Sequence, residues 1–172
     1  NGYNHTISGR DTISVNLDNL GTVEAEGGTL NLTGNVTQFS GETLTGGSWI
    51  ARANSSLNVT GGSDILTNRG NVILDGPGSQ FSRINTMETN DEHFQVMNGR
   101  SFTTAGNLVN NGFVIADTGS QIIVNGTYSS SSDPFSYTRV EGQFSATDHS
   151  SIHGMIYGSG QAGGSVIVEA DG

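Results

Sequence analysis

Residues 112–126 decide the fold, and they read Gly-Phe-Val-Ile-Ala-Asp-Thr-Gly-Ser-Gln-Ile-Ile-Val-Asn-Gly. Two short runs rich in β-branched residues flank the turn-forming residues Asp117, Thr118 and Gly119, and Gly126 turns the chain again. The stretch therefore predicts a strand, a tight turn, a second strand and a corner.

The same pattern recurs earlier in the chain. When Gly47 is laid on Gly112, fifteen positions align without a gap, and Trp49 falls on Val114. The anchoring glycines are spaced by 26, 23 and 42 residues, the last being two periods of 21, and they stand at Gly21, Gly47, Gly70 and Gly112. Self-similarity at such a period indicates a solenoid, in which equivalent positions of successive coils stack.

This period with short strands is typical of a parallel β-helix. Left-handed β-helices keep a strict six-residue pattern, which this chain lacks, so irregular coils favour the right-handed form. The alternative is an antiparallel β-sandwich, which has short strands too but needs no fixed period. We therefore predict an all-β, right-handed parallel β-helix (β-solenoid) with coils of about 21–26 residues, as a single domain over 1–172.

The repeat weakens in two places. One period after Gly70 the counted position holds Asp91, in a polar stretch for which we expect a loop insertion over 83–93, with a strand following at 93–97. The serine-rich stretch 128–137 predicts a second surface loop. Because the chain starts in mid-pattern, we expect it to be a segment of a longer chain.

Composition and charge exclude several classes of function. The net charge is -10 and all six basic residues are arginine, so the chain lacks the basic surface that binds nucleic acid. No stretch approaches the roughly 18 apolar residues of a membrane span, so we expect no membrane insertion by this segment. Cysteine is absent, which excludes disulfides, thiolate metal sites and a cysteine nucleophile.

Several segments resemble the coils of secreted bacterial β-helix proteins. They are Asn-Xaa-Gly-Xaa-Val at Asn19 and Asn68, Asn110–Val114, and Gly-Gly-Thr-Leu-Asn-Leu-Thr-Gly at 27–34. Such coils form the passenger regions of autotransporters and the large haemagglutinin-like adhesins. The resemblance covers roughly residues 12–128. It implies a non-catalytic structural or adhesive segment, extracellular or at the cell surface, although a minority of similar β-helices are polysaccharide lyases or hydrolases.

An enzymatic alternative depends on charged side chains that stack. The alignment places Glu26, Arg52, Asp75 and Asp117 at one corner of successive coils. Neighbours one coil apart lie about 4.8 Å from each other, within the reach of a carboxylate pair that cleaves a glycosidic bond. An exposed corner, where charge costs little and aspartate favours the turn, is the simpler interpretation. We therefore expect no catalytic residue, with a polysaccharide-active enzyme as the alternative.

Clustered carboxylates in the expected insertion are candidate ligands of a cation. Glu88, Asp91 and Glu92 offer the hard oxygen donors that Ca²⁺ prefers, but the regular Asp-x-Asp-x-Asp-Gly loop is missing. A solvated loop without any cofactor is the simpler interpretation. His149 and His153 are four residues apart on a strand-turn stretch, without the helical pattern of a zinc site.

Aromatic residues around the serine-rich stretch are the candidate ligand-binding residues. Tyr128, Phe135 and Tyr137 can form an exposed platform that stacks on a sugar ring, or they can pack the loop onto the coil. Trp49 aligns with core positions and is expected to be buried. If the three residues form an exposed platform, the expected partner is a host or environmental glycan, or a surface protein.

Overall fold

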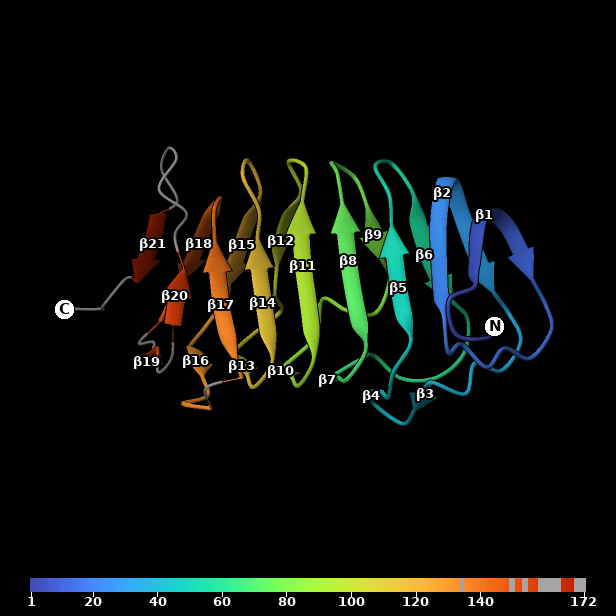
Figure 1. Ribbon diagram of the computed structural model, residues 1–172, viewed down its shortest axis with the longest axis horizontal. Coiled ribbons are helices and arrows are strands. Elements are labelled where there is room, and N and C mark those ends of the chain that lie inside the picture. The colour runs from blue at the N-terminus through green and yellow to red at the C-terminus, as the bar shows by residue number, and fades with distance from the viewer. Residues whose placement is uncertain (134, 149–150, 153–154, 158–164, 169–172) are drawn as a thin grey trace.

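The chain forms a β-solenoid whose strands stack in parallel. The structure, a computed structural model, describes residues 1–133, 135–148, 151–152, 155–157 and 165–168 (Figure 1). No helix occurs among these residues. Of the paired strands in this part of the chain, only β3 (Phe39–Ser40) and β4 (Thr43–Leu44) run antiparallel. The β-sandwich alternative is therefore wrong.

Three sheets form the walls of the solenoid, and within each sheet the strands of successive coils lie side by side. The ten-stranded first sheet contains β1 (Thr6–Ile13), β2 (Thr22–Leu32), β5 (Ser48–Ala51), β6 (Ser56–Val59), β8 (Asn71–Asp75), β9 (Gln80–Phe81), β11 (His93–Met97), β14 (Phe113–Ala116), β17 (Tyr137–Val140) and β20 (Met155–Tyr157). The second contains β3, β4, β7 (Thr67–Asn68), β10 (Thr89–Asn90), β13 (Leu108–Asn110), β16 (Tyr128–Ser130) and β19 (Ser151–Ile152). The third contains β12 (Ser101–Thr103), β15 (Gln121–Val124), β18 (Gln143–Ala146) and β21 (Ser165–Val168).

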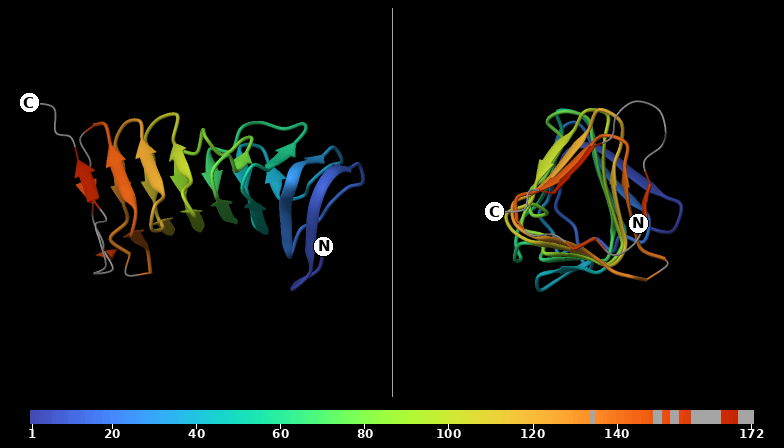
Figure 2. Two further views of the ribbon diagram at one scale, coloured as in Figure 1. Left: turned by 90° about the horizontal axis from the view of Figure 1, so that it is seen from above. Right: turned by 90° about the vertical axis from the view of Figure 1, so that its left-hand side faces the viewer.

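The solenoid is right-handed, as predicted. In Figure 1 the front strands β5, β8, β11 and β14 run upward, the strands behind them run downward, and the chain advances from right to left. The chain therefore turns about the solenoid axis in the sense of a right-handed screw as it advances. Seen end-on, the coils superimpose around a roughly triangular interior (Figure 2).

The register of the first sheet confirms the predicted repeat. Equivalent first positions of the strands are 20 to 26 residues apart, and they are Thr22, Ser48, Asn71, His93, Phe113 and Tyr137. One position further on, Trp49, Val72, Phe94 and Val114 stack inside the solenoid. The alignment of Gly47 on Gly112 is thus correct, and one coil is a residue shorter than predicted.

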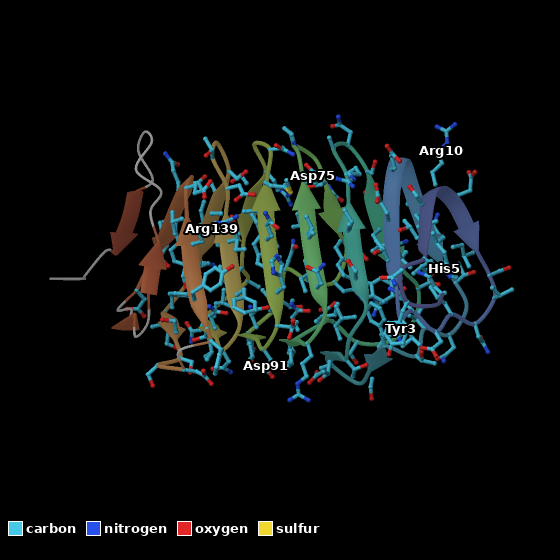
Figure 3. The ribbon with its side chains drawn as sticks, viewed as in Figure 1. Tyr3, His5, Arg10, Asp75, Asp91 and Arg139 are labelled. Atoms are coloured by element: carbon cyan, nitrogen blue, oxygen red, sulfur yellow. The ribbon has the colours of Figure 1, made fainter. Side chains whose placement is uncertain are left out.

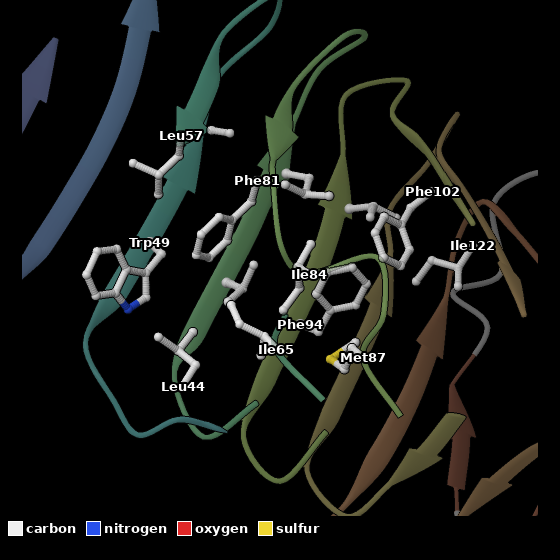
Figure 4. Close-up of a cluster of buried hydrophobic side chains, with 14 of the residues drawn as sticks. Leu44, Trp49, Leu57, Ile65, Phe81, Ile84, Met87, Phe94, Phe102 and Ile122 are labelled. Carbon is white, nitrogen blue, oxygen red and sulfur yellow. The ribbon is translucent and has the colours of Figure 1, made fainter. Parts of the chain in front are cut away.

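Side chains from all three walls fill the interior. Trp49 is fully buried, as predicted, and its indole N–H donates to the carbonyl of Gly46 at 2.8 Å. Its ring stacks on Phe81 at 6.2 Å between centroids, and Phe94 contacts Phe102 at 4.7 Å (Figure 4). Aromatic pairs at these separations add stability beyond the area they bury.

Buried asparagines stack along one inner corner. The Asn68 amide donates to the Asn90 Oδ1 at 2.8 Å, and the Asn90 amide to the Asn110 Oδ1 at 2.9 Å. All three side chains, the asparagine ladder, have no exposed surface. The Oδ1 atoms of Asn68 and Asn110 also accept the N–H of Gly70 and Gly112. Because buried amides are costly when unpaired, this arrangement locks the register of the coils.

The predicted loop insertion over 83–93 is wrong. Ile84 and Met87 are fully buried, and β10 pairs with both β7 and β13, so this stretch is an ordinary coil. Glu92 stands at the position of Gly70 and Gly112, which hides the repeat from glycine spacing. The strand expected at 93–97 is present as β11.

The second predicted loop is shorter than 128–137. Tyr128–Ser130 belong to β16 and Tyr137 begins β17, so the connection is confined to residues 131–136. Within it, the backbone N–H of Phe135 donates to Asp133 Oδ1 at 2.9 Å, and Ser136 Oγ donates to the Ser131 carbonyl at 3.1 Å. These bonds link the described residues of the connection to one another, and the Phe135 side chain is exposed to solvent.

Candidate functional site

The outer face of β11, β14 and β17 carries a row of rings. Side chains alternate between the two faces of a strand, so the first residue of each of these strands points outward when the second points inward. The outward residues His93, Phe113 and Tyr137, here called the aromatic row, are half-buried. The centroids of Phe113 and Tyr137 are 4.7 Å apart, and those of His93 and Phe113 are 6.3 Å apart.

The asparagine ladder holds this row in place. Each ladder amide donates to the backbone carbonyl of a row residue in the next coil: Asn68 to His93 at 3.1 Å, Asn90 to Phe113 at 3.1 Å and Asn110 to Tyr137 at 3.2 Å. The spacing of the rings is therefore set from inside the solenoid. A surface fixed in this way loses little entropy when it binds.

Polar side chains continue along the same strands beside the rings. Gln95 Nε2 donates to Asp117 Oδ2 at 2.5 Å, and Arg139 Nη2 donates to Asp117 Oδ1 at 2.8 Å. Arg139 also lies 3.5 Å from Glu141, and Gln95 contacts the His93 ring at 3.3 Å. We call Gln95, Asp117, Arg139 and Glu141 the polar network. Figure 3 places Arg139 on this front sheet.

Rings and polar network together suit one kind of ligand. Aromatic rings offer flat apolar surface, and the network offers fixed donors and acceptors within the same face. A sugar ring has the same combination of an apolar face and equatorial hydroxyls. The geometry can therefore bind a glycan by stacking and by hydrogen bonds.

Tyr128, one of the predicted ligand-binding residues, does not belong to this face. It is fully buried as the first residue of β16, its hydroxyl bonds Thr138 Oγ1, and its ring meets Phe144 at 4.7 Å. Burial raises the pKa of the Tyr128 hydroxyl to about 12. The expectation that Tyr128 is exposed is thus wrong, because the strand places it on the inner face.

The other two predicted aromatic residues are separated in role. Phe135 is 81% exposed on the connection between β16 and β17. Tyr137 packs on Phe113 within the aromatic row. Sequence reasoning missed Phe113 and Arg139, although the outward positions of the aligned coils contain both.

The predicted cation ligands lie elsewhere. Asp91 pairs with Arg69 Nε at 3.0 Å and accepts the Asn111 amide at 2.8 Å, at the lower edge in Figure 3. Glu88 lines a separate groove with Asn107. Among the residues with described placement, no three metal-ligating side chains gather. A calcium site at Glu88, Asp91 and Glu92 stays a prediction, and His149 and His153 lie outside the described residues.

The predicted charged corner forms two separate ion-pair groups. Arg52 binds Glu24 at 2.7 Å and also Asp75, which raises the pKa of Arg52. Its partner in the preceding coil is therefore Glu24 rather than Glu26. Asp117 bonds Arg139 instead, because Met97 occupies the corner between Asp75 and Asp117.

Comparisons with known proteins give no family. No family model matches the chain, and no curated protein or solved structure matches it. Within the described part of the chain, no helix has the length and apolar character to cross a membrane. Any function must therefore be inferred from the geometry of the face itself.

Proposed function

We propose that this chain is a non-catalytic structural or adhesive segment of an exported surface protein, and that it binds a glycan on the outer face of β11, β14 and β17. The observation that carries the proposal is the stacked pair Phe113 and Tyr137 beside the polar network of Gln95, Asp117, Arg139 and Glu141. The extracellular or surface location belongs to the same proposal, and the resemblance of the coil motifs to secreted bacterial β-helix proteins supports it.

The rigid frame supports an adhesive role. Parallel coils joined by the asparagine ladder present the rings at fixed spacing along the solenoid axis. A glycan lying along that axis contacts equivalent positions of several coils at once. Weak contacts that repeat on a rigid surface add up without a large loss of entropy.

Asp117 and Glu141 support a second candidate function. Two carboxylates on one exposed face are the side chains that cleave glycosidic bonds. Both carboxylates contact Arg139, as expected of structural ion pairing, and this contact favours the non-catalytic role. The alternative of a polysaccharide-active enzyme predicts new reducing or unsaturated sugar ends.

A glycan panel with matched variants tests the proposal. The wild-type chain and the variants Phe113→Ala and Tyr137→Ala are titrated calorimetrically with the glycans that score on an array. We expect each variant to lower the affinity by about tenfold, because one stacked ring is lost. Phe135→Ala removes an equally large but more exposed ring outside the row, and should leave the affinity unchanged.

Three outcomes contradict parts of the proposal. If no glycan binds, or if Phe113→Ala binds as well as wild type, the face is not a glycan site. If Phe135→Ala alone weakens binding, the connection over 131–136 carries the ligand. Release of new sugar ends, lost in Asp117→Asn or Glu141→Gln, replaces the non-catalytic proposal with the enzymatic one.

A further inference from the structure

A groove lies across the corner that follows the polar network. It crosses the turns after β14 and β17 and the outer side of β12, β15 and β18, and its volume is about 320 Å³. Such a volume is at the lower end of the range for small-ligand sites. Three successive coils line it, and their side chains in this corner groove are Arg100, Ser101, Thr118, Gln121, Glu141 and Gln143.

Arg100 lies in this groove without a carboxylate partner. Its Nη1 donates to the carbonyl of Ser101, and its Nε is buried without a hydrogen-bond partner. Loss of water around the guanidinium lowers the pKa of Arg100. Arg52, Arg69 and Arg139 each contact a carboxylate, whereas no described carboxylate lies within ion-pair distance of Arg100. A cation held in this way favours an anionic group from outside the chain.

Neutral hydrogen-bonding groups surround the cation. Ser101 Oγ donates to Gln121 Oε1 at 3.2 Å, and Gln143 stacks on Gln121 in the next coil. Gly142 lets the turns approach closely, since a Cβ there would lie 2.1 Å from the Ser120 carbonyl oxygen. Because Gln121 and Gln143 are register partners, their side-chain amides stand one coil apart, at a spacing suited to successive hydroxyls of one ligand.

The other charged side chain in the groove is Glu141. It lies 3.5 Å from Arg139, which also bonds Asp117, so two carboxylates share one cation in the polar network. The chain as a whole carries a net charge of -10, which repels a dense polyanion. The groove is thus suited to one negative group on an otherwise neutral, hydroxyl-rich ligand. An acidic peptide would bring several charges and few hydroxyls.

We propose that the corner groove binds an isolated acidic sugar of a largely neutral glycan, with Arg100 bonding its carboxylate and Ser101, Gln121 and Gln143 bonding its hydroxyls. The inference rests on the proposed glycan-binding function and deepens it, because Glu141 belongs to both the polar network and the groove. A glycan that stacks on Tyr137 can continue past Arg139 and Glu141 into the corner. The acidic sugar then decides which glycan binds.

Calorimetry on the wild-type chain tests the charge preference directly. The probes are a neutral oligosaccharide that ends in glucuronic acid, its methyl ester and the same oligosaccharide ending in glucose. We expect the acid to bind about tenfold more tightly than the ester, because a charge-assisted bond to Arg100 is lost on esterification. This comparison needs no variant, so it stays decisive even if a substitution at Arg100 prevents folding.

Variants then assign the preference to the groove. Arg100→Gln should abolish the difference between acid and ester, while thermal unfolding confirms that the variant folds. Arg69→Gln removes the same charge at a distant site, where Arg69 pairs with Asp91, and should keep the difference. Equal binding of acid and ester, or a preference that survives Arg100→Gln, overturns the inference.

Further probes separate the possible sources of the anion. A sulfated counterpart or a glutamate-rich peptide that binds more tightly than the glucuronide also overturns the inference, since each points to another ligand class. If the glucose-terminated probe binds and Phe113→Ala weakens it, the proposed function stands even when the acid shows no preference. If none of the probes and none of the array glycans binds, the proposed function itself fails.

Discussion

Phe94 and Phe113 stand one coil apart on neighbouring strands and face opposite ways. Phe94 points inward between Val72 and Val114 and has no exposed surface. Phe113 points outward between His93 and Tyr137 and remains partly open to solvent. The difference is one position along the strand, which reverses the direction of the side chain. The same residue type therefore stabilises the fold at one site and forms the candidate binding face at the other.

The inward and outward columns obey different constraints. An inward side chain must fill the space that its stacked neighbours leave, and it must leave no polar atom unpaired. An outward side chain has water as an alternative partner, so the fold permits many residues there. Stability is therefore expected to depend on the inward columns, and ligand specificity on the outward ones.

The largest expected effect is the difference in stability loss between a substitution in an inward column and one in an outward column. Phe94→Ala opens a cavity between coils and should lower the free energy of unfolding by about 3–5 kcal/mol. Phe113→Ala removes a half-buried ring that contacts Tyr137 on the outer face, and should lower the free energy of unfolding by only about 1 kcal/mol. Urea denaturation of both variants gives the comparison. Equal losses would show that the outward face is part of the core.

The asparagine ladder should follow as the next largest contribution. Asn90→Ala leaves one of the two buried N–H groups of the Asn68 amide unpaired and removes a donor to both Asn110 Oδ1 and the Phe113 carbonyl, and should cost about 3 kcal/mol. Asn111→Ala is the matched control, because Asn111 is exposed one residue after the ladder and its side chain donates to Asp91 Oδ1 at 2.8 Å. Its loss should stay within about 1 kcal/mol. If urea denaturation shows similar losses of unfolding free energy for both variants, the asparagine ladder does not contribute specially to stability.

The contrast also explains what the sequence predicts. The inward columns of Trp49, Val72 and Val114 repeat an apolar side chain, and this repetition is sufficient to predict the solenoid, while the lack of a strict six-residue pattern favours its right-handed form. Glu92 broke the glycine pattern because its side chain points to solvent, where glycine is not required. The asparagines at 68, 90 and 110 repeat in the same coils and would have located the missing turn.

The candidate binding face was only partly predictable. Tyr137 is predicted from its place beside the serine-rich stretch. Tyr128 is misplaced because 128–137 is predicted as one loop, whereas Tyr128–Ser130 form β16 and place Tyr128 on the inner face. Phe113 contacts Tyr137 in the next coil, and Gln95 and Arg139 both bond Asp117, each 22 residues away along the chain. No local pattern contains such contacts, which appear only when the register is known.

Titration separates a buried group from an exposed one. Tyr128 belongs to the interior, and its pKa of about 12 lies above the ordinary value near 10. The resulting stability is fully present below pH 10 and is lost as the pH rises from about 10 through 12, by on the order of 2–3 kcal/mol. Urea denaturation across this window should show the loss, and Tyr128→Phe should remove it. An unchanged slope in Tyr128→Phe would contradict the assignment to Tyr128.

The smallest expected effect belongs to Asp18 on the exposed surface. The Gln38 amide donates to Asp18 Oδ1 at 2.6 Å and the Thr37 hydroxyl donates to it at 2.9 Å, and these bonds lower the pKa of Asp18 below its ordinary value. The associated stability is present above that ordinary value, and it is lost as the pH falls below it through the folded pKa. Carboxyl chemical shifts should show a lowered pKa for Asp18, which Thr37→Val raises while leaving the fold intact. A pKa at or above the ordinary value would mean that even these bonds are exchanged for water, which would sharpen the division between an ordered interior and a permissive surface.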